Sequence, residues 1–598
     1  MKIFYLLTLS VLFVSTSLFA QVDGYPKGLT DDEIRFLQEN GGLNFTHLNR
    51  GIESPPEFDG IRTMAEWEEI QVLTISWISY RSILKEIVRN AKEECLVLIL
   101  SDNPNQTIDY LNSNNGGPAL DNLDNVEVIS ADYNSIWMRD YAGNSVYGNE
   151  VDDLFMVDWI YNRPSRPDDD SSPEVIADYL GLDIYSTTSA PTDMVNTGGN
   201  FMSDGFGTGF ASKLILEENE AGNFYGVSAK DEADIDQIMS DFMGIDRFIK
   251  METLPYDAIH HIDMHMKLLN EHTLLMGEYP EGEADGPQIN ANLEYVLSNF
   301  NSMFDEPYDV IRIPMPDSPS GLFPDDNPAG YYRTYTNSVF INNTVLVPTY
   351  REQYDTTAMR IYNEALPGYN IVGIDCDDEP DLIIAASGAL HCITHSIGVE
   401  DPLLISHQAL PDTEDDINDY VVSAYVNHRS GVQSATLFYR TDEGGAYQEV
   451  TMMDLGENNW SAFIPAQNVG TEIDYYIHAE AISGKEQNRP MPAPEAYYRF
   501  KVLGEVVSVA ELKASSSLDV FPNPANAITC IPVEMALSSK ASITLYDVTG
   551  KLVLSVFEGN IPSGITKYFI DAASLNPGAY ILVLQTEQFQ ISKRLMVN

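Results

Sequence analysis

The sequence predicts a mixed α/β protein built in three parts, and three observations carry that prediction. Residues 55–412 alternate between helical and strand patterns, as expected of an α/β domain. Residues 413–503 consist of short segments in which apolar and polar side chains alternate, which is typical of a β-sandwich. Residues 515–598 are again rich in strand patterns and predict a small C-terminal β-domain.

The N-terminus has the pattern of a secretory signal peptide. In residues 1–20 a single lysine precedes an apolar run that ends at Ala20, before the polar Gln21. The run is barely long enough to cross a membrane, so we expect it to be removed rather than to act as an anchor. Residues 21–54 then form an N-terminal segment, and no later stretch predicts a transmembrane helix in the mature chain.

The first part contains clear individual elements. Residues 80–94 repeat apolar side chains at helical spacing, and residues 95–100 then have the pattern of a buried strand. Residues 337–350 have the pattern of a β-hairpin. Asp355 is the expected N-cap of the helix that follows, because a carboxylate at that position accepts from exposed backbone amides.

The second and third parts show strand patterns throughout. Alternation is clearest in residues 421–426, 435–440 and 473–481. Short strands at this spacing favour an immunoglobulin-like β-sandwich for residues 413–503. In the third part, residues 542–556 have a strand–turn–strand pattern.

The composition excludes some classes of partner. Lys and Arg number 33 and Asp and Glu number 90, which gives a formal net charge of −57. Binding to phosphate needs clustered cations, so nucleic acid is not an expected partner. So acidic a surface should instead attract cationic ligands, among which guanidinium compounds are the obvious biological class. The four cysteines are too few for a disulfide framework.

Four segments concentrate unusual polar residues, and together they resemble the guanidino-group-modifying enzymes, in the branch of bacterial peptidyl-arginine deiminases and agmatine deiminases. Trp137-Met138-Arg139-Asp140 is similar to the W-x-R-D motif of that family, and Thr197-Gly198-Gly199-Asn200 is similar to its GGN turn. His261-Ile262-Asp263 matches H-x-D, and His391-Cys392 lies where the family carries its nucleophilic cysteine. The resemblance implies a five-bladed α/β propeller, the pentein fold, with an active site on its axis.

The chemistry of a guanidinium group explains why these residue types are needed. The group is planar and positive, so carboxylates placed to accept paired hydrogen bonds can orient it, and Asp140 and Asp263 are the candidates. The thiolate of Cys392 can then attack the central carbon. His261 suits proton delivery to the leaving ammonia and activation of water. By resemblance, Asn337 positions the nucleophile or the adduct, and no metal or other cofactor is required.

Two further groups of residues concern the substrate. Trp137 can form a wall of the guanidinium site by cation–π stacking. Arg163 and Arg166 can grip a substrate carboxylate, which favours arginine or C-terminal peptidyl arginine over agmatine. The alternative is a solvated loop in which residues 168–170, all aspartates, neutralise the two arginines.

Cys376 is the rival nucleophile. It is surrounded in sequence by acidic residues, which are expected to raise its pKa and suppress the thiolate. Cys392 follows His391 and precedes His395, so we expect it to have the more favourable electrostatic setting.

The C-terminal part resembles the sorting domain of proteins exported by the type IX secretion system of Bacteroidetes. The resemblance rests on VFPNPANA (520–527), DVTGKLV (547–553) and LNPGAYILVL (575–584). It implies the type IX secretion machinery as a partner, passage through the outer membrane, and a secreted or cell-surface-attached protein.

These observations give one main hypothesis and two alternatives. The main hypothesis is an exported cysteine hydrolase acting on linear amidines, which converts the guanidino group of free or peptidyl arginine to citrulline and ammonia through a covalent thiouronium intermediate. The first alternative is an agmatine deiminase that forms N-carbamoylputrescine. The second is a surface-binding protein without catalytic activity, since fold alone does not fix function.

Overall fold

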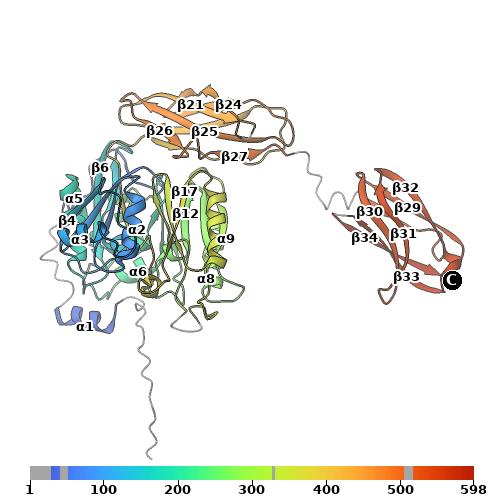
Figure 1. Ribbon diagram of the computed structural model, residues 1–598, viewed down its shortest axis with the longest axis horizontal. Helices are drawn as coiled ribbons and strands as arrows, with labels where there is room; N and C mark the ends of the chain where they lie inside the picture. The colour runs from blue at the N-terminus through green and yellow to red at the C-terminus, as the bar shows by residue number, and fades with distance from the viewer. Residues whose placement is uncertain (1–28, 41–50, 326–329, 443, 504–515, 587) are drawn as a thin grey trace, which may run out of the picture. The chain divides into compact units, whose positions relative to one another are not determined.

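The computed structural model describes residues 29–40, 51–325, 330–442, 444–503, 516–586 and 588–598. The expected signal peptide, residues 1–20, lies outside the described residues. The chain forms two compact units (Figure 1). The first comprises Met1–Pro411, Asp419–Pro465 and Glu472–Phe500, and the second comprises Asp412–Asn418, Ala466–Thr471 and Lys501–Asn598.

The first unit begins with a region of mixed α/β structure, as predicted. Among the described residues this region forms five small sheets. The first contains, in spatial order, β1 (Ile61–Thr63), β5 (Asn144–Gly148), β6 (Asp153–Tyr161) and β7 (Ile184–Thr187), with β8 (Val195–Asn196) also paired to β6. The second contains β11 (Arg247–Met251), β10 (Thr208–Ser212) and β9 (Met202–Ser203). The others contain β12 (Met266–Asn270), β13 (Thr273–Glu278) and β14 (Asp309–Pro314); β15 (Val339–Ile341), β16 (Thr344–Thr349) and β17 (Asn370–Asp375); and β18 (His395–Gly398), β2 (Ile70–Ser76), β3 (Leu96–Ser101) and β4 (Val126–Ser130).

Helices connect the strands. The α-helices of the described chain are α1 (Asp31–Asn40), α2 (Arg81–Ala91), α3 (Pro104–Leu111), α4 (Met138–Tyr141), α5 (Ser172–Leu180), α6 (Leu214–Asn219), α7 (Glu232–Met243), α8 (Gly286–Asn299) and α9 (Glu352–Ala365). Short 3-10 turns are η2 (Asp169–Ser171), η3 (Gly198–Asn200), η4 (Ile262–Met264), η5 (Ile383–Ala386) and η6 (Ala572–Ser574). None of the described helices is long and apolar enough to span a lipid bilayer.

One local plan recurs in each of these sheets. An antiparallel pair of strands is followed, after one or two helices, by a strand that runs parallel to the second member of the pair. In the last sheet the antiparallel pair joins β18 to β2, with His395 opposite Thr74. The two ends of the α/β region therefore meet in one sheet, and this pairing brings the segment next to Cys392 back to the start of the region.

The local predictions for this region are mostly confirmed. The amphipathic segment 80–94 contains α2, which packs Ile83, Ile87 and other buried apolar side chains into the core, and the strand that follows is β3. Strands β15 and β16 form the predicted hairpin. The cap prediction is wrong, because α9 begins at Glu352 and Asp355 lies inside its first turn. The carboxylate of Asp355 instead accepts from the backbone N–H of Tyr350 at 2.9 Å and from the hydroxyl of Tyr335 at 2.8 Å.

The rest of the first unit is β-structure, as its alternating sequence predicts. Its strands form two sheets. The first contains β19 (Leu404–Ser406), β20 (Tyr420–Asn427), β24 (Asn459–Ile464) and β23 (Met453–Gly456). The second contains β22 (Gln448–Thr451), β21 (Val432–Arg440), β25 (Glu472–Ala481) and β26 (Glu486–Arg489), with β27 (Tyr498–Lys501) also paired to β25. Strand β20 shows the expected alternation, because its buried side chains are separated by more exposed ones.

The second unit is also built of strands. Its two sheets are β28 (Ser517–Leu518), β29 (Ile528–Met535) and β32 (Gly564–Asp571), and β31 (Leu552–Ile561), β30 (Ser539–Asp547), β33 (Gly578–Thr586) and β34 (Gln590–Val597). The predicted strand–turn–strand segment 542–556 is confirmed by β30 and β31, which pair antiparallel. Apolar side chains such as Ile543, Leu545 and Leu582 form the core of this unit.

Candidate active site

Short turns bring the polar motifs of the sequence toward one another. Asp140 lies in α4, Gly199 in η3 and Asp263 in η4, and η3 contacts both α4 and η4. Cys392 lies between η5 and β18, and its carbonyl oxygen accepts from the backbone N–H of Arg139 at 3.1 Å. The motifs are therefore joined through backbone contacts as well as through their side chains.

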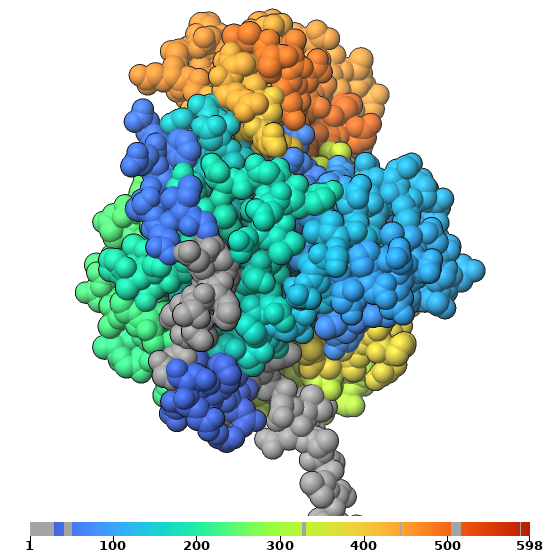
Figure 2. All heavy atoms as spheres, turned by 90° about the vertical axis from the view of Figure 1, so that its left-hand side faces the viewer, coloured from blue at the N-terminus to red at the C-terminus, as the bar shows by residue number. Residues whose placement is uncertain are grey.

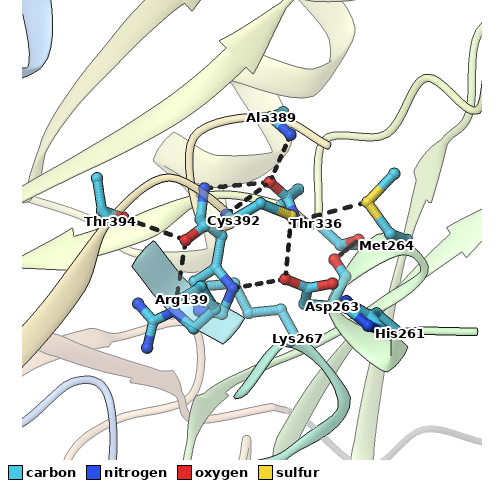
Figure 3. Close-up of polar contacts among 12 residues, drawn as sticks. Arg139, His261, Asp263, Met264, Lys267, Thr336, Ala389, Cys392 and Thr394 are labelled. Atoms are coloured by element: carbon cyan, nitrogen blue, oxygen red, sulfur yellow. Dashed lines mark hydrogen bonds and ion pairs between the residues drawn. The ribbon is translucent and has the colours of Figure 1, made fainter. Parts of the chain in front are cut away.

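The sulfur of Cys392 lies between an amide and a carboxylate. Its side chain is buried, with Sγ 3.1 Å from Asn337 Nδ2 and 3.6 Å from Asp263 Oδ2 (Figure 3). The Asn337 side chain also holds the turn that carries the cysteine, because its Oδ1 accepts from the backbone N–H groups of Ala389 and His391, both at 3.1 Å. Asn337 thus fixes the position of the sulfur from two directions.

Asp263 presents one carboxylate oxygen to the protein and keeps the other unsatisfied. Oδ2 lies 2.8 Å from His391 Nδ1, whereas Oδ1 is buried and has no hydrogen-bond partner in the described part of the chain. Burial acts to raise the pKa of Asp263, but the hydrogen bond and charge of His391, with smaller contributions from His261 and Arg139, hold it below its usual range. An ionised carboxylate with an unsatisfied buried oxygen is suited to accept from a cationic donor.

Asp140 and His261 lie side by side. Asp140 Oδ1 accepts from the backbone N–H of Gly199 at 3.3 Å and lies 3.5 Å from His261 Nδ1. Burial raises the pKa of Asp140, and the nearby charge of Asp263 adds to that effect, while His261 and Arg163 oppose it. Neither ring nitrogen of His261 makes a hydrogen bond within the described residues, although both are buried. A cation placed between the two carboxylates would relieve their repulsion.

Most of the predicted residues line one cavity of about 20 Å³. Its walls are formed by Trp137, Asp140, Tyr161, Asn162, Arg163, Arg166, Ile259, His261, Ala386, Ser387 and Cys392. Asp263 and Asn337 do not line this cavity but contact the sulfur of Cys392 directly. Cys376 is fully buried and does not line the cavity.

Glycines make this crowding possible. A Cβ atom added to Gly199 would lie 2.4 Å from His261 Nδ1 and 3.0 Å from Asp140 Oδ1. A Cβ atom at Gly388 would lie 2.4 Å from Cζ3 of Trp137. These separations are below van der Waals contact, so any other residue at either position would push the carboxylate, the imidazole or the indole out of place.

The sequence did not indicate the charges behind Asp263. His391 Nε2 lies 3.0 Å from Glu66 Oε2, and Lys267 Nζ lies 2.7 Å from Glu66 Oε1. Burial acts to raise the pKa of Glu66, but Lys267, His391 and Arg139 hold it well below its usual range. Lys267, Glu66, His391 and Asp263 therefore form a continuous buried chain of polar contacts that ends at the sulfur of Cys392.

Comparison with known proteins agrees with this arrangement. The family model for the Porphyromonas-type peptidyl-arginine deiminases matches residues 62–397, which is more than half of the 598 residues. The chain belongs to that family. Membership makes it a hydrolase of the deiminase type, acting on a guanidino group. Residues 519–598 match the secretion system C-terminal sorting domain.

Individual relatives of this deiminase-family chain are distant but span the same region. A protein of Vibrio parahaemolyticus whose name contains agmatine deiminase is 22% identical over 390 residues, which cover 58% of this chain and 99% of the relative. The solved agmatine deiminase of C. jejuni is 21% identical, covers 56% of this chain and 96% of its own, and has a TM-score of 0.45. A solved protein of Porphyromonas gingivalis whose title contains arginine deiminase is 19% identical, covers 57% of this chain and 99% of its own, and has a TM-score of 0.49.

The electrostatic reason for preferring Cys392 over Cys376 is wrong. Burial, followed by the charges of Asp263 and Asp140, raises the pKa of Cys392 well above its usual value, and hydrogen bonds from Ala389 and Asn337 oppose this. Burial raises the pKa of Cys376 strongly as well. The two thiols therefore differ in their position relative to the cavity, and the preference for Cys392 rests on geometry.

The main groups that lower the pKa of Cys392 are Ala389 and Asn337 rather than the neighbouring histidines. The ring of His391 contacts Asp263 and Glu66. The pKa of His395 is held well below its usual value by burial and by the charge of Arg139, so this imidazole is neutral. The buried guanidinium of Arg139 is a cation of the protein itself that interacts electrostatically with Cys392.

The raised pKa of Cys392 predicts how the free protein reacts with alkylating agents. Iodoacetamide, which is neutral, should modify Cys392 slowly near neutral pH and faster as the pH rises, because the thiolate is the reactive form. An alkylating amidine should react at least about tenfold faster, since its charge offsets the two carboxylates. Both rates are measured by peptide mass analysis and divided by the rate with free cysteine. Equal normalised rates for the two reagents would contradict this account.

Proposed function

We propose that the chain is an exported cysteine-dependent deiminase that hydrolyses the guanidino group of peptidyl arginine to citrulline and ammonia. The observation that carries the proposal is the buried Sγ of Cys392, 3.6 Å from the Asp263 carboxylate, in the wall of a cavity shared with Asp140 and His261. A nucleophile, two carboxylates and an imidazole close to one another are the groups that attack on a guanidinium carbon needs.

Binding of the substrate prepares the nucleophile. The guanidinium lies between Asp140 and Asp263, and the unsatisfied Oδ1 of Asp263 accepts one of its N–H groups. The ligand charge offsets the two carboxylates that raise the pKa of Cys392, so the thiolate forms in the complex rather than in the free protein. Trp137, in the same wall, lies in position to stack on the flat cation.

The chemistry then proceeds through a covalent intermediate. The Cys392 sulfur forms a bond to the guanidino carbon, and His261 gives a proton to one terminal nitrogen as its bond to that carbon breaks and ammonia leaves. The remaining thiouronium is attacked by water, which loses a proton to His261. The hydroxyl of the adduct loses its proton as the carbon–sulfur bond breaks and the electron pair returns to sulfur. That proton converts the released ammonia to ammonium, and the ureido product departs. Guanidinium and water are thus converted to a urea group and ammonium.

We propose a domain organisation that fits an exported deiminase. The recurrent strand plan supports five blades of a pentein propeller within residues 55–412. Residues 413–503 are an immunoglobulin-like sandwich, and residues 515–598 are the sorting domain that directs the chain through the type IX secretion machinery after the signal peptide, residues 1–20, is removed. The sorting-domain match at residues 519–598 supports a secreted protein or one attached to the cell surface, and we place it at the outer membrane.

The two arginines of the cavity favour a substrate that carries a carboxylate. Arg163 and Arg166 line the same space as Cys392, and a guanidinium fork pairs well with a carboxylate. Agmatine has no such group, whereas a C-terminal arginine does. Agmatine stays the second candidate, because relatives such as the C. jejuni protein are named agmatine deiminases.

Replacement of Arg163 by alanine tests this choice. The KM for a peptide with a free C-terminal arginine should rise about 10- to 100-fold, which corresponds to the loss of one charge-assisted hydrogen bond or pair of bonds. The KM for agmatine should change less than about threefold, because the variant removes no contact to the guanidino group. Citrulline or N-carbamoylputrescine and ammonia are measured in parallel.

An Arg360→Ala variant is the matched control, since Arg360 is exposed on α9 and, among the described residues, forms its ion pair with Glu364 in the same helix. It should resemble the wild type with both substrates. An equal rise in KM for agmatine and for the arginine peptide in Arg163→Ala would show that Arg163 does not bind a substrate carboxylate.

A further inference from the structure

The imidazole of His391 lies between two carboxylates, and the proposed mechanism gives it no part. Its Nδ1 is 2.8 Å from Asp263 Oδ2, and its Nε2 is 3.0 Å from Glu66 Oε2. The His391 side chain is 2% exposed and that of Asp263 is 1% exposed. The α/β region that encloses them is closely packed on the face drawn in Figure 2, where its segments run from blue to yellow. Each ring nitrogen therefore faces a carboxylate oxygen, with little water to compete.

Both carboxylates are placed to accept hydrogen bonds. Glu66 Oε1 lies 2.7 Å from Lys267 Nζ and accepts from the backbone N–H of Phe340 at 3.2 Å. Burial acts to raise the pKa of Glu66, but the charges of Lys267 and His391 hold it well below its usual range. His391 likewise holds the pKa of Asp263 below its usual range, against the effect of burial. Both groups are therefore ionised near neutral pH and have no proton to donate.

An imidazole can bond to two ionised carboxylates only when both of its nitrogens carry a proton. The neutral ring has one N–H and one lone pair, so one nitrogen would direct its lone pair at a carboxylate oxygen. The contacts of His391 with Glu66 and Asp263 therefore identify it as an imidazolium. A cation held between two anions is also the arrangement in which burial of charge is tolerated.

Other charged or titratable groups face His391 from three further elements. Arg139, on α4, donates through Nε to the His391 carbonyl oxygen at 3.4 Å. Lys267, on β12, contacts the other oxygen of Glu66. The pKa of His395, on β18, is lowered mainly by burial and by Arg139, with a smaller effect of His391. The two cations favour loss of a proton from the His391 ring, so both carboxylates are needed to retain it.

We propose that Glu66 is a positioning residue that keeps a proton on both nitrogens of His391, so that His391 holds Asp263 ionised and oriented for the guanidinium. The inference rests on the proposed function, because Asp263 is one of the two carboxylates that bind the substrate there. The Nδ1–H of His391 occupies Oδ2, which also faces the Cys392 sulfur at 3.6 Å. Oδ1, which has no hydrogen-bond partner within the described residues, is left for the substrate. The substrate cation then completes a row of alternating charges that begins at Lys267.

The protonation of His391 is measured by NMR of the full chain, labelled with ¹⁵N in its histidine rings and free of substrate. The signals of His391 are identified by their loss in His391→Asn. At about pH 8, above the ordinary imidazole pKa of about 6.5, both ring nitrogens should carry a proton in the wild type. In Glu66→Gln only one should, because the glutamine amide can donate to Nε2 and the nearby cations then outweigh Asp263. Glu69→Gln, which removes a glutamate paired with Lys485, is the matched control and should resemble the wild type.

Turnover supplies the second measurement. Glu66→Gln should lower kcat/KM about 10- to 100-fold, the effect of losing one hydrogen bond to a charged group. The loss should be equal for agmatine and for a peptide ending in arginine, since both present the same guanidino group to Asp263. In His391→Asn, whose amide can still donate to Asp263, the further change Glu66→Gln should alter kcat/KM less than about threefold, because Glu66 acts through the imidazole. Thermal unfolding checks that each variant is folded.

Three results would overturn the inference. They are a neutral His391 ring in the wild type at about pH 8, full activity in Glu66→Gln, and an effect of Glu66→Gln that is equally large with and without the imidazole. Wild-type turnover of either substrate beside any of these results leaves the proposed function standing. Turnover of neither substrate would overturn the proposed function, while the NMR measurement, made without substrate, still decides the protonation of His391.

Discussion

Replacement of Cys392 by alanine is expected to lower kcat/KM for guanidino substrates by about four orders of magnitude or more, because loss of a catalytic nucleophile has effects of that size. No other thiol of the described residues lines the cavity. Folding should be little affected, since among the described residues the sulfur is contacted mainly by Asn337 at 3.1 Å, by the backbone of Ala389 and, at a longer distance, by Asp263. Ammonia release and the mass of the ureido product are the measurements.

Cys376→Ala provides the matched control for this variant. Cys376 is equally buried, its pKa is also raised, and the hydrogen bond that its thiol makes among the described residues goes to the carbonyl of Ile374 at 3.5 Å. Activity within about threefold of the wild type is expected, as for a substitution outside the reacting groups. Retained activity in Cys392→Ala would show that Cys392 is not the nucleophile. Loss of activity only in Cys376→Ala would show that Cys376 is the nucleophile instead.

The second large effect is expected for Asp263→Asn. The amide keeps the shape of the side chain but removes the charge that holds the guanidinium and leaves one acceptor oxygen in place of two, so His391 and the guanidinium can no longer both be served and kcat/KM should fall about 100- to 1,000-fold. The pKa of Cys392 should also drop, because the Asp263 charge is one of the causes that raise it. Alkylation of Cys392 by iodoacetamide near neutral pH should therefore become faster while turnover becomes slower.

Asp204→Asn is the control for a buried aspartate. Asp204 is fully buried and accepts from the backbone N–H groups of Phe206 and Thr208, and it does not line the cavity. Its replacement should change stability more than kcat/KM. A parallel fall of thiol reactivity and turnover in Asp263→Asn would show that the carboxylate supports the thiolate, the opposite of the role derived above.

The elements that the sequence predicted well are those with a long, regular pattern. Helix α2 and strand β3 have several apolar residues at one spacing, and both are found where expected. The recurrence of the strand plan was not visible, because it lies in how strands pair rather than in repeated residues. Strand β9 contains only Met202 and Ser203, and the pair β18–β2 joins residues from opposite ends of the region. Neither a two-residue strand nor a long-range pairing leaves a periodic signal.

The same limit applies to the site. The four motifs marked Asp140, His261, Asp263 and Cys392 because unusual polar residues gather in short segments. Glu66 was missed because it is a single charge that meets His391 across a separation of 325 residues. The charge argument for Cys392 failed because burial dominates its pKa, and burial is a property of the folded chain rather than of the neighbours in sequence.

The most direct test of the central claim is the mass of the peptide that contains Cys392, taken from protein quenched with acid while it turns over an arginine substrate. The account predicts a covalent adduct on the Cys392 sulfur whose added mass is that of the substrate less ammonia. An adduct on another residue, or rapid turnover in which the Cys392 peptide is never modified, would contradict it.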